Sequence, residues 1–542
     1  MSYEVNDSDL FIPSKAVEIF PLARQDVRPN GDGVSQVQFD IDRSMGFFNP
    51  NTMKLRYTTT FQGRGSPHPS PSCGSNAFWR HQRIQTQDGL NILSETDELS
   101  SWISAQYSYT SNDGMNNNRS LSEGLVNTTN SKNILFWEAQ SNPNEARTTA
   151  LTAKNVQINS NLYSGVFGTQ IVPVGAMGGL HLVLQTNNTM KSVKTLPCDF
   201  KNAVEVKTTS PKASWNNADI SVNVVVQVKG NVDSSNDNHF VIGDKVYATD
   251  STEASSFPVG VIVKVGFTGS VVELIINGFN GASTDLQANL TADTTKLFVK
   301  SSDRFNGYST GNNVPTTTPE LLLAVAQASV KISWTLSDLK LNVEQVIPPK
   351  NYTNQVVSKM KSKSGYLFNF KHISLKRINI QGVNGALSAQ VPIGQEGNRV
   401  YSLNVMPLKA VDVFNENNLV CDNPDYAEDY QWLINNQNVP DQRCDLKKLS
   451  QIPAKTNQLH TQELRKSLVN CGISVRNLQN PQSNFIIGRA TSDYGHTSNI
   501  RGSDVALRVS YGSQATIQKV FNVYVCSQRT LVIKDDAMMV VD

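Results

Sequence analysis

The chain has 542 residues and a formal net charge of +2, and 17% of its residues are charged. This length allows three or four domains of about 150 residues, and the small net charge excludes a general affinity for polyanions. No run of about 18 apolar residues is present, so no transmembrane segment is predicted. Only 39% of the residues are hydrophobic, and the abundance of Ser, Thr, Asn and Gln is typical of loop-rich β proteins.

The first 34 residues are polar and contain Pro13, Pro21 and Pro29. Because proline interrupts helices and central strands, residues 1–34 are predicted to form an N-terminal arm. The opening sequence MSYEVNDSDLF has no basic stretch followed by an apolar run, unlike a secretory signal. The six cysteines are far apart and form no CxxC pair, which favours reduced thiols in a protein made inside a cell.

Alternation of apolar and polar residues predicts a series of strands in the first half of the chain. An Asp88–Gly89 turn joins two of them, and a short helix follows, with Leu99 and Trp102 on one face. Ser94 and Asp97 have the spacing of a capping box for this helix. The strand segments are VSQVQFDI (34–41), TMKLRYTTTF (52–61), FWRHQRIQTQDGLNIL (78–93), GLHLVLQTN (179–187) and SVKISWTLSDLKLNVEQVI (329–347).

The second half of the chain repeats this order of segments. Its patterns are LFNFKHISLKRINI (367–380), YQWLINNQNVP (430–440), the helix TQELRKSLVNCGI (461–473), DVALRVSYG (504–512) and FNVYVCSQRTLVIKDDAMMVV (521–541). Leu180 and Ile332 are 152 residues apart, whereas their counterparts Val505 and Phe521 are 16 apart, so the first half has 136 additional residues. The chain therefore consists of two similar units and one insertion.

The insertion is predicted within residues 190–328. It contains its own strand patterns, such as ISVNVVVQVKG and FVIGDKVYAT, separated by glycine turns, which indicates a small barrel or sandwich. An independently folded module is tolerated at a surface loop because it disturbs the host fold little. The predicted division is a first unit over 35–350, interrupted by this insertion, and a second unit over 351–542.

Candidate metal and phosphate sites are weak. The seven histidines are isolated, and His68 and Cys73 share a loop without the second ligand pair that zinc requires. The segment VGAMGGL (174–180) is glycine-rich, but a strand follows it, so a turn is predicted and not a phosphate-binding loop.

Candidate catalytic and nucleic-acid-binding residues are equally weak. Asp535 and Asp536 are adjacent in a predicted turn and do not face each other across a cleft as glycosidase carboxylates do. The basic run KMKSKSG (359–365) is predicted to be a solvated linker between the units. We predict no catalytic residue, cofactor-binding residue, metal ligand or cofactor, and no enzymatic activity. Six aromatic residues are interpreted as core anchors: Phe78, Trp79, Trp102, Trp137, Trp334 and Trp432.

The order of these segments resembles that of the double jelly-roll major capsid proteins of virophages and polinton-like viruses, in the PRD1–adenovirus lineage. Three features carry the resemblance. They are RIQTQDGLNILSE leading into a short helix, the segment with Trp334 that ends in EQVIPP, and RTLVI near the C-terminus. The resemblance implies an all-β fold of two tandem eight-stranded jelly rolls, with a small β insertion domain in the first roll.

The resemblance also implies a function. Three chains would form a pseudo-hexagonal capsomer, and capsomers would tile an icosahedral shell in the virion after synthesis inside the infected host cell. The expected partners are further copies of the chain, a penton protein and minor capsid or cement proteins, without sequence-specific binding of nucleic acid. The arm would lie near the capsid interior, the 190–328 insertion would project outward with possible host-surface contact, and the loop over 110–133 would contribute to the trimer interface.

Two other classes of protein stay open. A virion spike or another carbohydrate-binding or receptor-binding β protein would need an exposed aromatic cluster, and the 190–328 module alone could have this role. A β-sandwich hydrolase would need two carboxylates about 5–9 Å apart in a groove.

Overall fold

The computed structural model describes most of the chain, with gaps. The described residues are 12–63, 67–70, 73–110, 119, 122–124, 126–127, 132–133, 154–168, 171–194, 204–211, 223–228, 240, 243–249, 256–268, 271–278, 296–300, 303, 331–381, 388–392, 399–409, 426–446, 458–476, 485–492, 496–512, 518–535 and 537–541.

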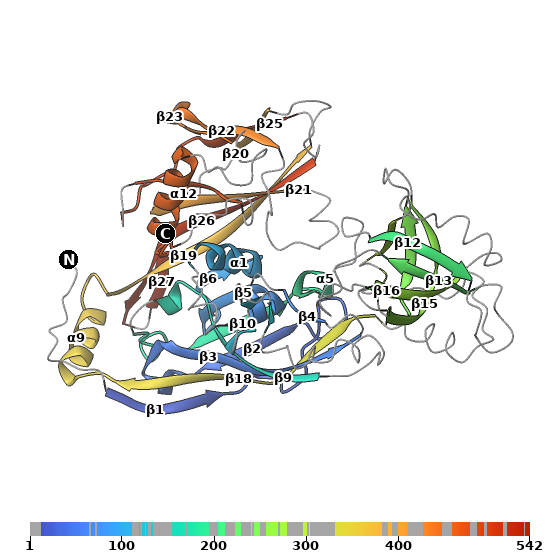
Figure 1. The fold of residues 1–542 in the computed structure, drawn as a ribbon. Helices are drawn as coiled ribbons and strands as arrows, with labels where there is room; N and C mark the ends of the chain where they lie inside the picture. Colours follow the sequence, from blue (N-terminus) through green and yellow to red (C-terminus); the bar gives the residue numbers. More distant parts are fainter. Residues whose placement is uncertain are drawn as a thin grey trace.

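Two β-sandwiches form the body of the molecule (Figure 1). In the first, one sheet has the order β1-β18-β3-β9 and the other β2-β10-β5-β6. These strands are β1 (Ile12–Ile19), β2 (Gln36–Ile41), β3 (Phe47–Gln62), β5 (Trp79–Thr86), β6 (Ile92–Thr96), β9 (Lys154–Asn161), β10 (Leu180–Thr186) and β18 (Ser333–Ile347).

In the second sandwich, one sheet has the order β19-β26-β21-β24, with β27 also paired to β26, and the other has the order β20-β25-β22-β23. These strands are β19 (Tyr366–Gln381), β20 (Ser388–Pro392), β21 (Val400–Lys409), β22 (Ala427–Ile434), β23 (Gln437–Asp445), β24 (Ile487–Ala490), β25 (Val505–Tyr511), β26 (Gln518–Lys534) and β27 (Ala537–Val541).

Both sandwiches have the same topology. In each, the long closing strand lies between the first and third strands, as in β1-β18-β3 and β19-β26-β21, and the second strand pairs with the strand before the closing one. This double Greek-key order is that of a jelly roll. The predicted fold class, two tandem jelly rolls in a mainly β chain, is confirmed.

The predicted repeat is also confirmed element by element. Strands β10 and β25, which lie within GLHLVLQTN and DVALRVSYG, occupy the same place in their sheets. Helices α1 (Leu99–Thr110) and α12 (Gln458–Asn470) follow the corresponding strand pairs β5-β6 and β22-β23. Strand β18 runs without interruption through Ser337 and Asp338, where a bulge with Asp338 at φ 53° absorbs an irregularity in its pairing with β3.

Each roll has its own apolar core, built from alternate residues of its strands. In β10, Leu180, Leu182 and Leu184 are fully buried in the first core, while the intervening residues are half-buried. Trp334 is buried in this core and Trp432 in the second. Period-two burial on facing sheets therefore holds each sandwich together.

The structure corrects the prediction that residues 1–34 form an arm. Residues Ile12–Ile19 form β1 and pair with β18, so the first sheet begins inside the predicted arm over 1–34. Pro13 is compatible with this strand because β1 lies at the edge of its sheet and a bulge follows the proline. Val27 exchanges two backbone hydrogen bonds with Leu336, at 2.8 and 2.9 Å, and fixes the following stretch to the same roll.

A closed barrel lies within the predicted insertion over 190–328. Its core is separate from those of the rolls and includes Val246, Val261, Ile276 and Leu297. Residues Thr189–Lys194 (α5 and β11) belong to the first roll, because β11 pairs with β4 (His68–Pro69). The barrel strands, in the order β12-β13-β16-β15-β14-β17, are β12 (Val204–Pro211), β13 (Asn223–Val228), β14 (Lys245–Thr249), β15 (Ser256–Thr268), β16 (Val271–Gly278) and β17 (Lys296–Val299).

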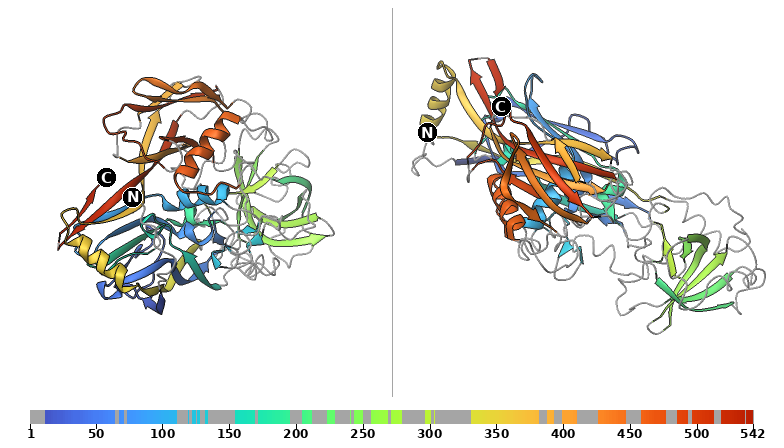
Figure 2. Two further views of the ribbon diagram at one scale, coloured as in Figure 1. Left: turned by 90° about the vertical axis from the view of Figure 1, so that its left-hand side faces the viewer. Right: turned by 90° about the horizontal axis from the view of Figure 1, so that it is seen from above.

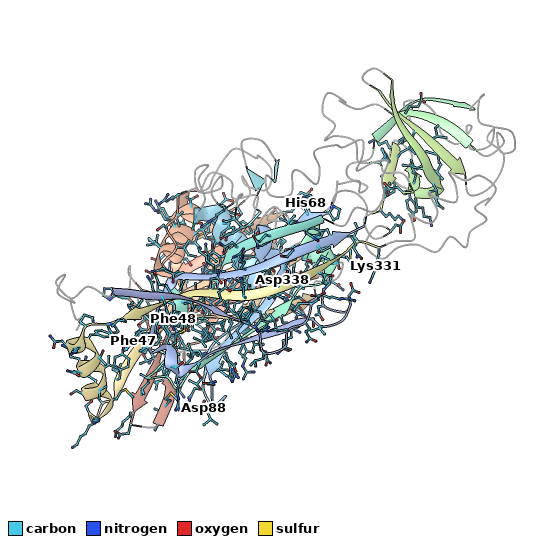
Figure 3. All side chains as sticks on the ribbon, turned by 90° about the horizontal axis from the view of Figure 1, so that it is seen from below. Phe47, Phe48, His68, Asp88, Lys331 and Asp338 are labelled. Carbon is cyan, nitrogen blue, oxygen red and sulfur yellow. The ribbon has the colours of Figure 1, made fainter. Side chains whose placement is uncertain are left out.

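The molecule has two different ends. The barrel stands apart at one end, as the right-hand view of Figure 2 shows, and His68 and Lys331 lie where it departs (Figure 3). Helix α9 (Lys350–Met360), β27 and the start of β1 lie at the other end (Figure 1). The basic run KMKSKSG is therefore not simply a linker: Lys359 and Met360 close α9, whose Val356 is buried and whose Tyr352 ring packs on Phe47.

Candidate functional site

The structure does not bring the residues considered for metal or phosphate binding together into one site. His68 lies in β4, and Cys73 is buried at the start of a short 3-10 helix. No group of three His, Cys, Asp or Glu side chains that could hold a metal occurs in the described part of the chain. The segment 174–180 is the predicted turn, because Gly178 and Gly179 have φ of 70° and 102° directly before β10.

The predicted core anchors Phe78, Trp79, Trp102, Trp334 and Trp432 are at most 2% exposed, which confirms that interpretation. Trp137 lies outside the described residues. Asp535, with φ of 48°, forms the turn between β26 and β27, and Asp536 is outside the described residues.

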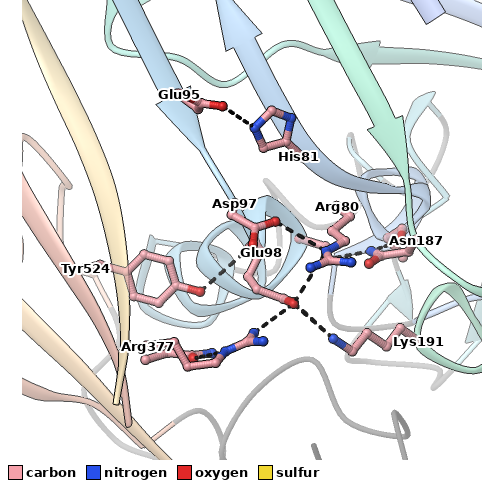
Figure 4. Close-up of polar contacts among 12 residues, drawn as sticks. Arg80, His81, Glu95, Asp97, Glu98, Asn187, Lys191, Arg377 and Tyr524 are labelled. Atoms are coloured by element: carbon pink, nitrogen blue, oxygen red, sulfur yellow. Dashed lines mark hydrogen bonds and ion pairs between the residues drawn. The ribbon is translucent and has the colours of Figure 1, made fainter. Parts of the chain in front are cut away.

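The charged cluster that the sequence did not indicate lies where the two rolls meet. Glu98, between β6 and α1, has φ of 48° and is 2% exposed. Lys191 Nζ donates to both carboxylate oxygens of Glu98 at 3.1 Å, and Arg377 Nη2 donates to Oε1 at 2.9 Å. Lys191 follows β10 in the first roll, whereas Arg377 belongs to β19 in the second, so one carboxylate joins the two units (Figure 4).

Neighbouring groups complete this cluster. Arg80 Nε is 3.8 Å from Glu98 Oε1, and Tyr524 of β26 donates its hydroxyl proton to the backbone oxygen of Glu98 at 3.3 Å. Arg377 Nε donates to Asn522 Oδ1 at 3.1 Å, which orients the guanidinium. Burial alone would raise the pKa of Glu98, but Lys191 and Arg377 hold it below its ordinary value, so the carboxylate stays charged.

An apolar seam runs beside the cluster. Trp102 of α1 lies against Tyr524, with ring centroids 4.9 Å apart, and both side chains are buried. Leu464 and Leu468 of α12 pack into the same group. Helix α1 therefore buries one face against the second roll, and the two jelly rolls share a continuous packed boundary.

Polar contacts extend this boundary along β6. Ser94 Oγ lies 3.3 Å from His372 Nδ1, and Thr96 Oγ1 donates to the backbone oxygen of Ile373 at 2.9 Å. Burial, with a contribution from Arg529, lowers the pKa of His372 to about 3, so the imidazole is neutral. Ser94 is thus a strand residue at the junction and not the capping residue that its spacing with Asp97 predicted.

A cavity of about 640 Å³ opens along the same boundary. Trp102 and Tyr107 from the first roll and Lys371 and Tyr401 from the second line it. Two buried carboxylates lie near this boundary: Glu98, which is charged and paired with Lys191 and Arg377, and Glu123, which accepts a hydrogen bond from the Tyr107 hydroxyl at 2.6 Å and whose pKa is raised by burial. The ion pairs and apolar contacts at this junction hold the two rolls in one fixed arrangement.

No family model matches this chain, and no curated protein matches it with significance. Its fold is similar to solved structures of viral capsid proteins. PBCV-1 VP54, fitted into a reconstruction of the virophage Sputnik, is 7% identical, with a TM-score of 0.48 over 98% of this chain and 97% of that one. The Faustovirus major capsid protein is 8% identical, with a TM-score of 0.46 over 98% and 92%. The mavirus major capsid protein is 10% identical, with a TM-score of 0.34 over 99% and 93%. At these identities the likeness concerns the fold alone.

Proposed function

We propose that this chain is a major capsid protein that assembles as trimeric, pseudo-hexagonal capsomers in an icosahedral viral shell. The observation that carries the proposal is the pair of jelly rolls of one topology, held side by side by Glu98 and the seam around Trp102. Three copies of such a chain supply six similar rolls, which suits a hexagonal lattice. A catalytic role has no comparable support, so the function is proposed to be structural.

The proposed domains are a first roll up to residue 350, interrupted by the insertion within 190–328, and a second roll over 351–542. The barrel end would face outward, where it could contact a host surface, and the α9 end would face the interior. Penton and minor capsid proteins are the proposed further partners. Among the described residues, no helix is long and apolar enough to cross a membrane.

The loop over 110–133 is proposed to line the trimer interface. Most of it lies outside the described residues, and the described part includes the short antiparallel pair β7 (Val126–Asn127) and β8 (Lys132–Asn133). Support comes from its position in the sequence, directly after α1, the helix that packs against the second roll.

Light scattering on the purified chain tests the proposal. A trimer of three 59.6 kDa chains has a mass of 178.8 kDa, and electron microscopy of concentrated trimer should show shells or hexagonal sheets. A monomer that forms neither under any assembly condition would contradict the proposal. It would favour the second candidate, a spike or receptor-binding protein, for which the separately folded barrel is the supporting observation.

A further inference from the structure

Exposed apolar side chains gather at the α9 end of the molecule, on elements that pack against one another. Leu367 of β19 and Met539 of β27 both flank Val532 of β26 and therefore lie on one face of the sheet. Five of the ten exposed large hydrophobic side chains in the described residues are at this end: Ile347, Val357, Leu367, Met539 and Val541. Such a concentration is typical of a surface that binds something.

The same end is basic. From Ile347 to Leu367 the chain has four lysines and no acidic residue. Lys534 ends β26, and the next residue, Asp535, donates its backbone N–H to the backbone oxygen of Met360 at 3.1 Å, so lysines outnumber the acidic residues here. Strand β27 pairs with β26 alone among the described strands, which leaves its other edge available to an extended segment. We call this surface the basal patch. It comprises the five apolar residues above together with Lys350, Lys359, Lys361, Lys363 and Lys534.

The first eleven residues of the chain, MSYEVNDSDLF, complement this surface. They contain the three acidic residues Glu4, Asp7 and Asp9 and no Lys or Arg, and Tyr3 and Val5 alternate with polar neighbours. In an extended segment Tyr3 and Val5 lie on one face, and Asp7 and Asp9 lie on the same face. Opposite charge and matching apolar character therefore meet at one end of the molecule.

Residues 1–11 join the structure at a point from which they can reach the basal patch. Ile12, the first residue of β1, is paired with Ile347, three residues before α9 begins. Eleven extended residues span at most about 36 Å, whereas a helix of the length of α9 spans about 16 Å. Residues 1–11 can therefore cross α9 and reach β27 without leaving the molecule.

We propose that residues 1–11 dock on the basal patch of their own chain, with the acidic side chains on the lysines and with Tyr3 and Val5 on the exposed apolar residues. This contact covers the patch before another surface can reach it. The inference does not rest on the capsid function, because a spike protein with this sequence would make the same contact.

Hydrogen–deuterium exchange tests the proposal on three forms of the chain. These are the full chain, a form without residues 2–11, and the charge-reversed form E4K/D7K/D9K. Amides of α9 and β27 should exchange about tenfold more slowly in the full chain than in the other two. Amides of β10, deep in the first roll, should exchange equally in all three and report that the fold is intact. Equal exchange of α9 and β27 in the full and shortened chains overturns the proposal.

A charge swap locates the contact. The patch variant K361E/K363E should lose the protection, and combining it with E4K/D7K/D9K should restore it, since the attraction is then rebuilt with the signs exchanged. Arg443→Glu, on β23 far from α9, is the control for the position of a charge reversal, to be compared with K361E alone, and it should leave the protection unchanged (Figure 1). Failure of the swap to restore protection overturns the assignment of the patch.

Two measurements distinguish docking of residues 1–11 within one chain from other occupants of the basal patch. Protection that rises with protein concentration would show docking between copies and would overturn docking within one chain. Vesicles of phosphatidylcholine with phosphatidylserine probe a lipid surface, which also attracts basic and apolar residues. The shortened chain should bind these vesicles more than the full chain, and equal binding would show that residues 1–11 do not cover the patch.

Discussion

At the scale of single residues, the junction between the rolls depends on one buried carboxylate. An isolated charge at the position of Glu98 would be costly, and Lys191 and Arg377 offset this cost with direct hydrogen bonds. These partners lie 93 and 279 residues from Glu98 in sequence. No local pattern links residues so far apart, which is why the sequence did not indicate the cluster.

Replacing Glu98 with Gln should destabilise the chain by about 3 kcal/mol, because Lys191 and Arg377 would keep their charges without a buried counter-charge. Glu95→Gln is the matched control, since the Glu95 side chain is 44% exposed and pairs with His81 at 3.0 Å, an interaction worth about 1 kcal/mol or less. Denaturant unfolding of both variants gives the comparison. Equal losses would show that the Glu98 cluster does not hold the rolls together.

His372 should make the stability depend on acid. Its pKa is about 3 in the folded chain and about 6.5 when unfolded. Between these values the unfolded state binds a proton that the folded state does not, so the unfolding free energy falls by up to about 1.4 kcal/mol per pH unit as the pH drops. The part of the unfolding free energy that depends on neutral His372 is fully present above pH 6.5. The unfolding free energy of His372→Gln, measured from pH 7 to 4, should fall less steeply with decreasing pH than that of the parent chain.

At the scale of elements, strands such as β3, β5 and β10 were predictable because one face of each is buried, so apolar and polar residues alternate along them. The edge strand β1 was missed because Pro13 and a bulge obscure its pattern. Helix α9 was missed because Val356 is its one buried residue, which leaves no apolar stripe at helical spacing. Helix α1 was predicted, but its packing against the second roll depends on tertiary contacts that its sequence does not contain.

Trp102→Ala should weaken both rolls together, because Trp102 lies in the seam against Tyr524. Removal of a buried tryptophan side chain costs about 3–5 kcal/mol. Trp334→Ala is the matched change inside the first core, where Trp334 packs on Phe78 with ring centroids 4.8 Å apart. Hydrogen exchange should accelerate in α1, α12 and β26 for the first variant and in the first roll alone for the second. A response to Trp102→Ala confined to one roll would contradict the shared boundary.

At the scale of the whole molecule, the doubling and the insertion were both visible in the sequence, because repeated segments keep their order when a module is inserted between two of them. The exact bounds of the insertion were harder to predict from the sequence. Residues 190–194 fall inside the predicted range, but they pack on the first roll, where the side chain of Asn188 accepts a hydrogen bond from the backbone N–H of Lys191 at 2.9 Å. A short cap and a two-residue strand leave no periodic signal.

Removal of the barrel should leave the two rolls folded. Replacing residues 195–330 with a Gly-Ser linker of about ten residues keeps β11 and the start of β18 and deletes a module whose core shares no residue with the cores of the rolls. The shortened chain should unfold cooperatively with a midpoint close to that of the full chain, and it should still form trimers by light scattering if the rolls make the capsomer.

Calorimetry of the full chain should show one additional transition, which belongs to the barrel. A shortened chain that fails to fold would mean that the barrel supports the first roll directly, and a folded monomer would place the contacts between chains on the barrel.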